Sequence, residues 1–236
     1  MDQLIQKQFT IRAFKAEENH DLCDKFIEGH KRVLLSVGVE EVSSSSNSWK
    51  YEPNVYVIIC ESNDGEKVYG GVRVHVYNDQ YVLPMVEATK EFDPSVADHI
   101  KNFSPAGTGE MCGLWNSIEV AGMGIGAVYL IRSAIAILTE LNLKSLWALC
   151  SPFSARIAKN YSFLKYPHVG NYGTFYYPKI DLLATVCMVD DSESLKDGNR
   201  EEVKKIFDLR RNLNVEKEEN NRGRDLRINY KLQLNA

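Results

Sequence analysis

The sequence lacks the patterns that define several large classes of protein. Its five cysteines and five histidines form no CxxC pair and no His/Cys/carboxylate cluster with metal-ligand spacing, so no metal site is expected. The cysteines are scattered singly, which excludes a disulfide framework and fits the reducing cytosol. Basic residues are not in excess either. The net charge of −4 argues against a protein that works by neutralising the phosphates of nucleic acid.

Long apolar runs are also absent. The N-terminal segment mixes polar and apolar residues and has no continuous apolar stretch of a signal peptide. The longest apolar run, 121–138, is interrupted by Arg132 and begins with several glycines, so no membrane span is expected. These absences predict a cytoplasmic protein. The 236 residues are 44% hydrophobic, which is enough to bury a sizeable core.

What the sequence does contain is an alternation of strand and helix patterns, which predicts a mixed α/β fold around one central sheet. An irregular insertion with one short helix is expected at 81–108, and a polar serine loop at 43–48. Strands are predicted at 9–14, 54–60, 67–77, 110–116, 143–150, 172–177 and 182–189, and helices at 17–35, 127–141 and 153–164.

The composition changes after residue 190. A charged amphipathic helix is predicted at 200–213, a highly charged stretch without an assigned element at 216–224, and an edge strand at 225–234. The sequence therefore predicts one domain over residues 1–190 and a charged appendage over 191–236. Mixed charge of this kind can dock a partner subunit, so a homodimer is one expected assembly.

Three alternating glycines, Gly122, Gly124 and Gly126, lie between a predicted strand and a predicted helix. Such a turn brings backbone N–H groups and the positive end of a helix dipole close to a phosphate or pyrophosphate. A tight turn packed against a neighbouring element would need the same glycines. A dinucleotide site would require a carboxylate at the end of the next strand, where 145–151 has none. A methyl-transfer fold would need more strand–helix units than the remaining chain supplies. Acyl-coenzyme A satisfies these requirements.

Two segments resemble the GCN5-related N-acetyltransferase superfamily. The stretch GEMCGLWNSIEVAGMGIG (109–126) is similar to the fourth strand and pyrophosphate loop of that family, and SARIAKNYSFLKY (154–166) to its late helix. The resemblance covers about residues 5–190 and implies a central mixed, mostly antiparallel sheet flanked by helices. Three positions depart from the family pattern. Ala121 replaces Gln or Arg, Lys165 replaces glycine and Ser154 replaces Asn.

This resemblance implies an N-acyltransferase that moves an acyl group from acetyl-CoA or a longer acyl-CoA to a small-molecule amine by direct attack. Glu110 matches the family's general base and Tyr161 the tyrosine that protonates the leaving thiolate. Their alternative interpretations are a surface carboxylate and a core aromatic. The pantetheine arm would run beside Leu114, Trp115 and Asn116. The pyrophosphate would lie on the loop formed by Gly122, Met123, Gly124, Ile125, Gly126 and Ala127.

A second resemblance involves the region before this strand. The segment 69–84, a long insertion and Glu110 are similar to the homoserine-lactone autoinducer synthases and the N-acyl amino acid synthases. Arg73 matches a family arginine and would bind substrate, whereas Gly113 stands where a second arginine is expected. This branch implies a fatty acyl donor on an acyl carrier protein and an acyl tunnel lined by 81–108. A plain strand arginine is the alternative for Arg73.

A third interpretation is a non-catalytic acyl-CoA-binding domain, which the alanine at position 121 favours. The aromatic residues of 172–177 line an acyl or acceptor pocket in one interpretation and belong to the core in the other. His75 is interpreted as a structural histidine.

Overall fold

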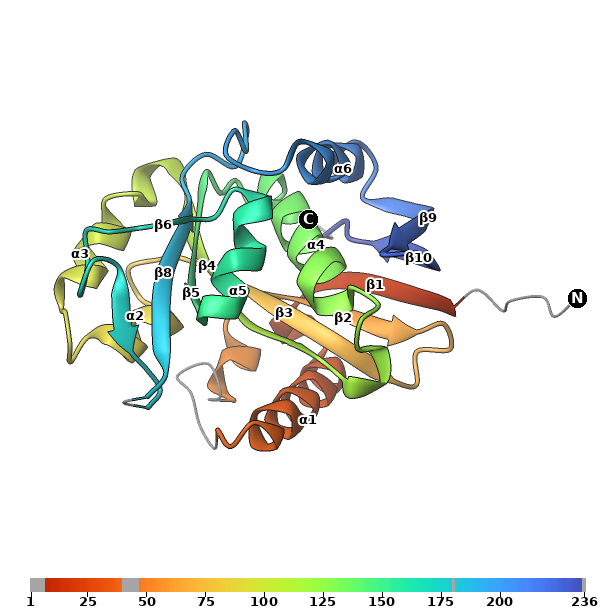
Figure 1. Ribbon diagram of the computed structural model, residues 1–236, viewed down its shortest axis with the longest axis horizontal. Coiled ribbons are helices and arrows are strands. Elements are labelled where there is room, and N and C mark those ends of the chain that lie inside the picture. Colours follow the sequence, from red (N-terminus) through yellow and green to blue (C-terminus); the bar gives the residue numbers. More distant parts are fainter. Residues whose placement is uncertain (1–6, 40–46, 180, 235–236) are drawn as a thin grey trace, which may run out of the picture.

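The computed structural model describes residues 7–39, 47–179 and 181–234. These residues form one ten-stranded sheet with the order β6-β8-β5-β4-β3-β2-β1-β10-β9, and β7 pairs with β8 (Figure 1). Only the β1–β10 and β4–β5 pairs are parallel, which confirms the predicted mixed, mostly antiparallel sheet. The strands are β1 (Lys7–Lys15), β2 (Val55–Ser62), β3 (Val68–Val76), β4 (Thr108–Asn116), β5 (Ser145–Cys150), β6 (Leu164–Lys165), β7 (Thr174–Tyr176), β8 (Leu183–Val189), β9 (Asn214–Asn221) and β10 (Arg224–Lys231).

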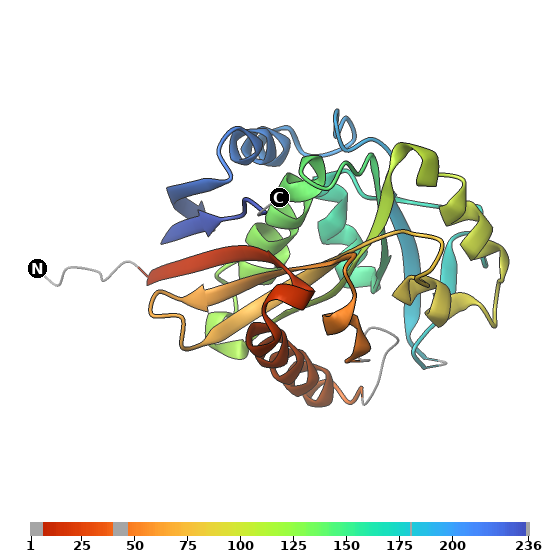
Figure 2. The same cartoon turned by 180° about the vertical axis from the view of Figure 1, so that it is seen from behind.

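Helices cover both faces of the sheet. Helices α4 and α5 lie on one face in Figure 1, and Figure 2 shows α1 on the opposite face. Asn19 begins α1, because its side chain accepts a hydrogen bond from the Leu22 amide at 3.1 Å. The helices are α1 (His20–Ser36), α2 (Pro84–Thr89), α3 (Ser95–Lys101), α4 (Ile131–Ala136), α5 (Pro152–Ala158) and α6 (Arg200–Arg211).

Three expected helical segments differ in detail. The helix predicted at 153–164 ends at Ala158, continues as a 3₁₀ turn over Lys159–Tyr161, and is followed by β6, which begins at Leu164. The single helix predicted at 127–141 begins earlier, with a π-helical turn over Ile125–Leu130, and continues through α4 into a 3₁₀ turn over Ile137–Thr139. The insertion contains two short helices, α2 and α3, where one was expected. Its apolar residues, among them Leu83 and Ile100, pack with Trp147 of β5 in one cluster. The expected serine loop lies mostly outside the described residues.

The sheet opens between β4 and β5. Their pairing runs from Thr108 opposite Ser145 to Glu110 opposite Trp147 and ends there. On the other side of β4, the four residues from Cys112 to Trp115 lie opposite the three from Arg73 to Gly71, so β4 contains a bulge. Gly113 lies in this bulge with φ +62°, a conformation that favours glycine. The second half of β4 therefore presents a backbone edge that β5 does not cover.

The C-terminal segment belongs to the same sheet. The predicted edge strand, β10, lies between β1 and β9, so its expected edge position is wrong. The highly charged stretch without an assigned element forms β9, whose charged side chains are tolerated because β9 is the edge. Leu226, Ile228 and Tyr230 of β10 alternate on the buried face and join the main core. The domain boundary at residue 190 stays a prediction.

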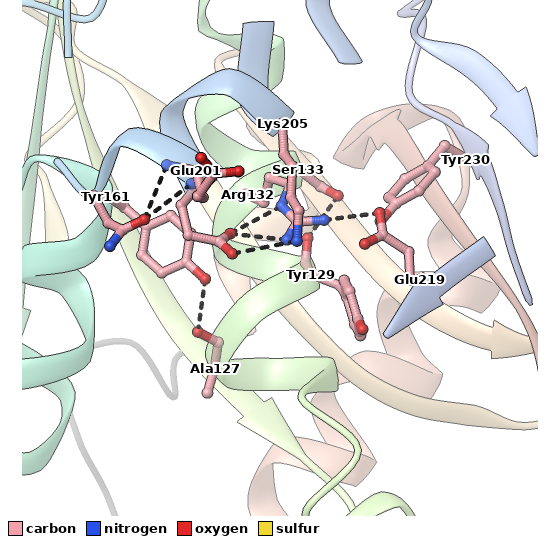
Figure 3. Close-up of polar contacts among 11 residues, drawn as sticks. Ala127, Tyr129, Arg132, Ser133, Tyr161, Glu201, Lys205, Glu219 and Tyr230 are labelled. Atoms are coloured by element: carbon pink, nitrogen blue, oxygen red, sulfur yellow. Dashed lines mark hydrogen bonds and ion pairs between the residues drawn. The ribbon is translucent and has the colours of Figure 1, made fainter. Parts of the chain in front are cut away.

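A buried ionic network fastens this segment to α4. Arg132 of α4 is 1% exposed and forms ion pairs of 2.8 Å with Glu202 of α6 and 2.8 Å with Glu219 of β9. The Tyr230 hydroxyl donates to Glu219 at 3.0 Å. Figure 3 shows Arg132 directed toward Glu219 and Tyr230. Four elements separated by up to about 100 residues in sequence therefore meet in one network, three of them directly at the guanidinium group.

Candidate active site

Two adjoining cavities occupy the opening between β4 and β5. The large cavity has a volume of about 530 Å³ and the small cavity about 150 Å³. They share Met111, Leu114, Cys150 and Ser154, so they lie directly beside each other. The large cavity is further lined by His30, Leu34, Val39, Met85, Glu110, Cys112, Gly113, Ala148, Leu149, Ser151, Pro152, Tyr177, Pro178, Asp181, Leu182, Leu183 and Ala184. The small cavity is further lined by Trp115, Asn116, Gly126, Ala127, Ile131, Phe153, Ile157 and Ala158.

Glu110 lies in the wall of the large cavity, at the last residue of β4 that pairs with β5. Its side chain is 2% exposed, and its Oε2 accepts a hydrogen bond from the Met85 amide at 2.8 Å. Burial raises the pKa of Glu110 to about 8, although this hydrogen bond and the charge of Arg73 oppose the rise. A carboxyl group with this pKa can take a proton from an amine near neutral pH.

Apart from Arg73, three titratable groups near Glu110 are uncharged near neutral pH. His30 of α1 lines the large cavity, and burial lowers its pKa to about 4. His75 lies opposite Glu110 in the β3–β4 register, and burial holds its pKa well below the usual value. Its Nδ1 is 3.0 Å from the Tyr81 hydroxyl. Burial also raises the pKa of the Cys112 thiol to about 12, so this cysteine is not a nucleophile.

Arg73, the predicted substrate-binding residue, lies behind the cavity wall. Its side chain is fully buried, and its guanidinium carbon lies 4.2 Å from the centre of the Trp49 ring. Its Nη2 lies 3.7 Å from Cys112 Sγ, whereas Arg73 itself is absent from the lining of both cavities. Arg73 therefore acts on the site through its charge, and its contact with substrate stays a prediction.

Tyr161 lies on the other side of the helix that begins at Ile125. Its hydroxyl donates to the Ala127 carbonyl oxygen at 3.3 Å, as Figure 3 shows. The residue is 2% exposed and lines neither cavity, and burial raises its pKa. The structure does not bring Tyr161 and Glu110 to the same cavity. The role of Tyr161 as a proton donor stays a prediction.

The predicted pyrophosphate loop divides into two parts. Five of the nine residues expected to hold the donor line the small cavity, namely Leu114, Trp115, Asn116, Gly126 and Ala127. Met123 and Ile125 point into the core. Gly122 and Gly124 have φ values of +74° and +86°, and a Cβ there would meet side-chain atoms of Arg224 and Asn221. The turn between β9 and β10 thus packs against these two glycines, as the tight-turn interpretation expected.

Several lining residues were not predicted from the sequence. They come from α1 and from the β7–β8 connection, as His30 and Asp181 do. These segments meet β4 only through tertiary packing, so no local pattern could reveal them. Within the 172–177 aromatic segment both interpretations hold in part, because Tyr177 lines the large cavity whereas Phe175 is in the core. Of the insertion 81–108, Met85 alone lines either cavity.

Other parts of the molecule offer fewer features suited to catalysis or ligand binding. A hollow of about 700 Å³ lies between β1, β9 and β10, several strands away from Glu110. Among residues 7–39, 47–179 and 181–234, no group of three or more His, Cys, Asp or Glu side chains is arranged to hold a metal ion. None of the helices in the described ranges is long and apolar enough to span a membrane.

Comparisons with known proteins find similarity at the level of structure. No protein-family model and no curated protein sequence matches the chain. The structure of FeeM, an N-acyl amino acid synthase from uncultured soil microbes, is similar with a TM-score of 0.58 and 12% identity, over 80% of this chain and 98% of FeeM. BjaI, a CoA-dependent acyl-homoserine lactone synthase, is similar with a TM-score of 0.52 and 12% identity, over 85% of this chain and 88% of BjaI.

An acyl-CoA N-acyltransferase from Pseudomonas aeruginosa is similar with a TM-score of 0.51 and 9% identity, over 76% of this chain and 98% of that protein. At these identities the similarity establishes the fold. The chain has the fold of the GCN5-related N-acetyltransferases, and structures from the synthase branch share it. Both resemblances that the sequence indicated are confirmed at this level.

Proposed function

We propose that this chain is an N-acyltransferase that transfers an acyl group from an acyl-CoA thioester to an amine. The observation that carries the proposal is the pair of adjoining cavities where β4 leaves β5, with the buried Glu110 carboxyl in the wall of the larger one. A thioester at the junction would present its carbonyl carbon to an amine in the large cavity. The small cavity would hold the arm of the donor.

The small cavity fits an extended pantetheine arm. Beyond Glu110 the edge of β4 is free of β5, so backbone groups around Leu114 and Asn116 can pair with the amides of the arm as a neighbouring strand would. Gly126 and Asn116 both line this cavity and pack closely together, because a Cβ on Gly126 would come within 2.5 Å of Asn116 Oδ1. The amide groups at the start of the helix at Ile125 point out of its N-terminus and favour a pyrophosphate.

Glu110 would act as the general base. Its carboxylate takes a proton from the ammonium form of the acceptor, and the free amine attacks the thioester carbonyl carbon. The C–N bond forms and the C–S bond breaks, with its electron pair leaving on sulfur. The attacking nitrogen loses a further proton as the amide forms, and the leaving thiolate takes up one proton, so these two changes balance. The elevated pKa of about 8 makes Glu110 a stronger base than an ordinary carboxylate.

A long-chain synthase that uses an acyl carrier protein is the second candidate, favoured by the similarity to FeeM. This candidate predicts an acyl tunnel lined by 81–108. Met85 alone of that insertion faces the cavities, and residues such as Val96 and Ile100 pack into a separate core cluster. An acyl-CoA donor therefore fits the geometry better. A non-catalytic acyl-CoA-binding domain would keep the small cavity and show no turnover.

Thermal shift and thiol release test the three candidates. The full chain is mixed with acetyl-CoA, octanoyl-CoA, free coenzyme A and an octanoyl carrier protein, with and without a panel of amines. We expect stabilisation by the CoA compounds and amine-dependent release of thiol. Release from the carrier protein alone would establish the synthase. Binding without release, unchanged by Glu110→Gln, would establish a non-catalytic domain. Absence of any shift and any release would overturn the proposal.

A further inference from the structure

Among the described residues, the large cavity is lined by acidic side chains but by no lysine or arginine. The two residues in its lining with acidic side chains are Glu110, deep in the wall, and Asp181, in the β7–β8 connection, and no lysine or arginine lines it within the described ranges. The residues outside those ranges, 1–6, 40–46, 180 and 235–236, include no lysine or arginine in the sequence. The large cavity therefore has no cationic side chain to receive a carboxylate.

Two cations, Lys179 and Arg73, adjoin the lining of the large cavity without belonging to it. Lys179 follows the lining residue Pro178, and its ammonium group donates to the Gly38 carbonyl oxygen beyond the end of α1. The Arg73 guanidinium is fully buried against Trp49, on the far side of the wall residue Cys112. Its positive charge offsets that of an ionised Glu110. The guanidinium lies against the backbone of the wall residue Gly113, where an added Cβ would come within 3.1 Å of Nε, but Arg73 is not itself a lining residue. His30, the remaining basic residue in the lining, is neutral because burial lowers its pKa to about 4.

Most of the remaining wall is apolar. Leu34 and Val39 come from the end of α1 and the segment after it, Met111 from β4, and Leu182 and Leu183 from the start of β8 and the residue before it. The volume of about 530 Å³ is in the range of cavities that enclose a small organic molecule. An apolar body would gain from burial here, and a desolvated carboxylate without a partner would cost several kcal/mol.

We propose that the acceptor is a primary amine with an apolar alkyl or aryl body and no carboxylate, an inference that rests on the proposed acyl transfer. The ammonium group would approach Glu110, and the apolar body would contact the walls from α1 and β8. This assignment excludes free α-amino acids as the preferred acceptors. It differs in that respect from what FeeM, described as an N-acyl amino acid synthase, produces.

Matched acceptors test this inference directly. Each pair contains an amine and the amino acid that differs from it by one carboxylate: phenethylamine and phenylalanine, tyramine and tyrosine, pentylamine and norleucine. Thiol release from acetyl-CoA and octanoyl-CoA by the full chain gives kcat/KM for each. We expect at least about a 100-fold preference for the amine in each pair, which matches an unfavourable difference of about 3 kcal/mol for the carboxylate.

The outcomes separate this inference from the proposed function. Equal or faster acylation of the amino acids would overturn the inference and leave the acyltransferase intact. Absence of turnover with every acceptor, together with no thermal shift from any acyl-CoA, would overturn the proposed function itself.

A charge placed at the cavity provides an independent check. Leu183→Arg adds a cation at a lining position that is 38% exposed, and Leu164→Arg adds the same cation at a 40% exposed position on β6 that lines neither cavity. We expect Leu183→Arg to raise kcat/KM for the amino acids relative to the amines by about tenfold, and Leu164→Arg to leave this ratio unchanged. An unchanged ratio in both variants would overturn the inference.

Discussion

The Met85 amide donates a hydrogen bond of 2.8 Å to the Glu110 carboxyl and thereby connects the first residues of α2 to the point where the sheet opens. This contact favours the ionised form, but burial outweighs it and raises the pKa of Glu110 to about 8. The result is a carboxyl group that is mostly protonated at pH 7 and mostly ionised above pH 9. The chemistry of the site should follow this titration.

The rate of acyl transfer should therefore rise with pH. We expect kcat/KM at saturating acyl-CoA to increase from pH 6 and to level off above an apparent pKa near 8, because only the carboxylate accepts a proton. Glu110→Gln should lower kcat by roughly 10²- to 10⁴-fold and remove this limb of the profile. The exposed Glu87→Gln on α2 is the control and should change neither. A wild-type profile that is flat between pH 6 and 9 would contradict the role of Glu110.

The same titration should appear in the stability of the protein. Glu110 binds a proton in the folded state up to about pH 8, whereas in the unfolded chain it loses this proton near its ordinary value of 4.5. The folded state therefore holds more protons in this range, and stability falls as pH rises. The buried His30 acts in the opposite sense, but only below its ordinary value of 6.5. The buried His75 acts in the same sense as His30, and both effects fade above pH 6.5, so the Glu110 contribution is the larger one between pH 6.5 and 8.

We expect the free energy of unfolding to decrease by roughly 1–2 kcal/mol between pH 6.5 and pH 8 in the wild type. Glu110→Gln, which cannot ionise, should lack this decrease. Urea titrations at three pH values in the interval measure it, with Glu87→Gln as the variant expected to follow the wild type. A parallel decrease in Glu110→Gln would show that the carboxyl titrates at its ordinary pKa.

The Tyr161→Phe variant tests two roles of this hydroxyl: the proton donor that the family resemblance implies, and the structural hydrogen bond that the geometry of this chain shows. The resemblance implies a proton donor, whereas the hydroxyl is bonded to the Ala127 carbonyl and lies outside both cavities. We expect kcat to change by less than about threefold and stability to fall by about 1 kcal/mol, the usual contribution of one hydrogen bond. Steady-state kinetics and urea unfolding measure the two effects.

Tyr129→Phe is the matched control. The Tyr129 hydroxyl is also buried but has no hydrogen-bond partner among the described residues, so its removal should not lower stability. A fall of 100-fold or more in kcat for Tyr161→Phe alone, at unchanged stability, would establish the proton donor that the resemblance implies.

The sequence predicts those parts of the site that depend on local pattern. Alternation along 110–116 is sufficient to place Glu110 and Asn116 on one strand, and three glycines identify the turn before the helix. The roles of Gly122 and Gly124 were not predictable, because the residues that pack on them, Asn221 and Arg224, follow about 100 positions later. Likewise, the pattern around Arg73 shows a strand but not that α1 and Trp49 bury its guanidinium. Long-range packing decides these features.

The position of β10 illustrates the same limit. The alternating residues of β10 are typical of a strand with one buried face. The sequence is equally consistent with a charged strand beside β10 and with solvent beside it. Parallel pairing with β1 joins residues at opposite ends of the chain, from Lys7 opposite Leu226 to Arg12 opposite Lys231. No local signal specifies this register. The ionic network at Arg132 provides a test of how the C-terminal strands are attached to the rest of the fold.

Arg132 should hold residues 191–236 on the rest of the fold. Its guanidinium is 1% exposed between Glu202 and Glu219, so Arg132→Met leaves two carboxylates without their partner, one of them only 7% exposed. Breaking a buried pair in this way costs about 3–5 kcal/mol. The triple variant Arg132→Met, Glu202→Gln, Glu219→Gln removes the uncompensated charges and should recover most of the loss.

All three tryptophans (Trp49, Trp115 and Trp147) precede residue 190, so their fluorescence during urea unfolding reports on the part of the sheet that carries the site. A lower midpoint by fluorescence in Arg132→Met would show that both parts unfold together. An unchanged midpoint, with faster hydrogen exchange confined to α6, β9 and β10, would instead establish the C-terminal segment as a separable appendage.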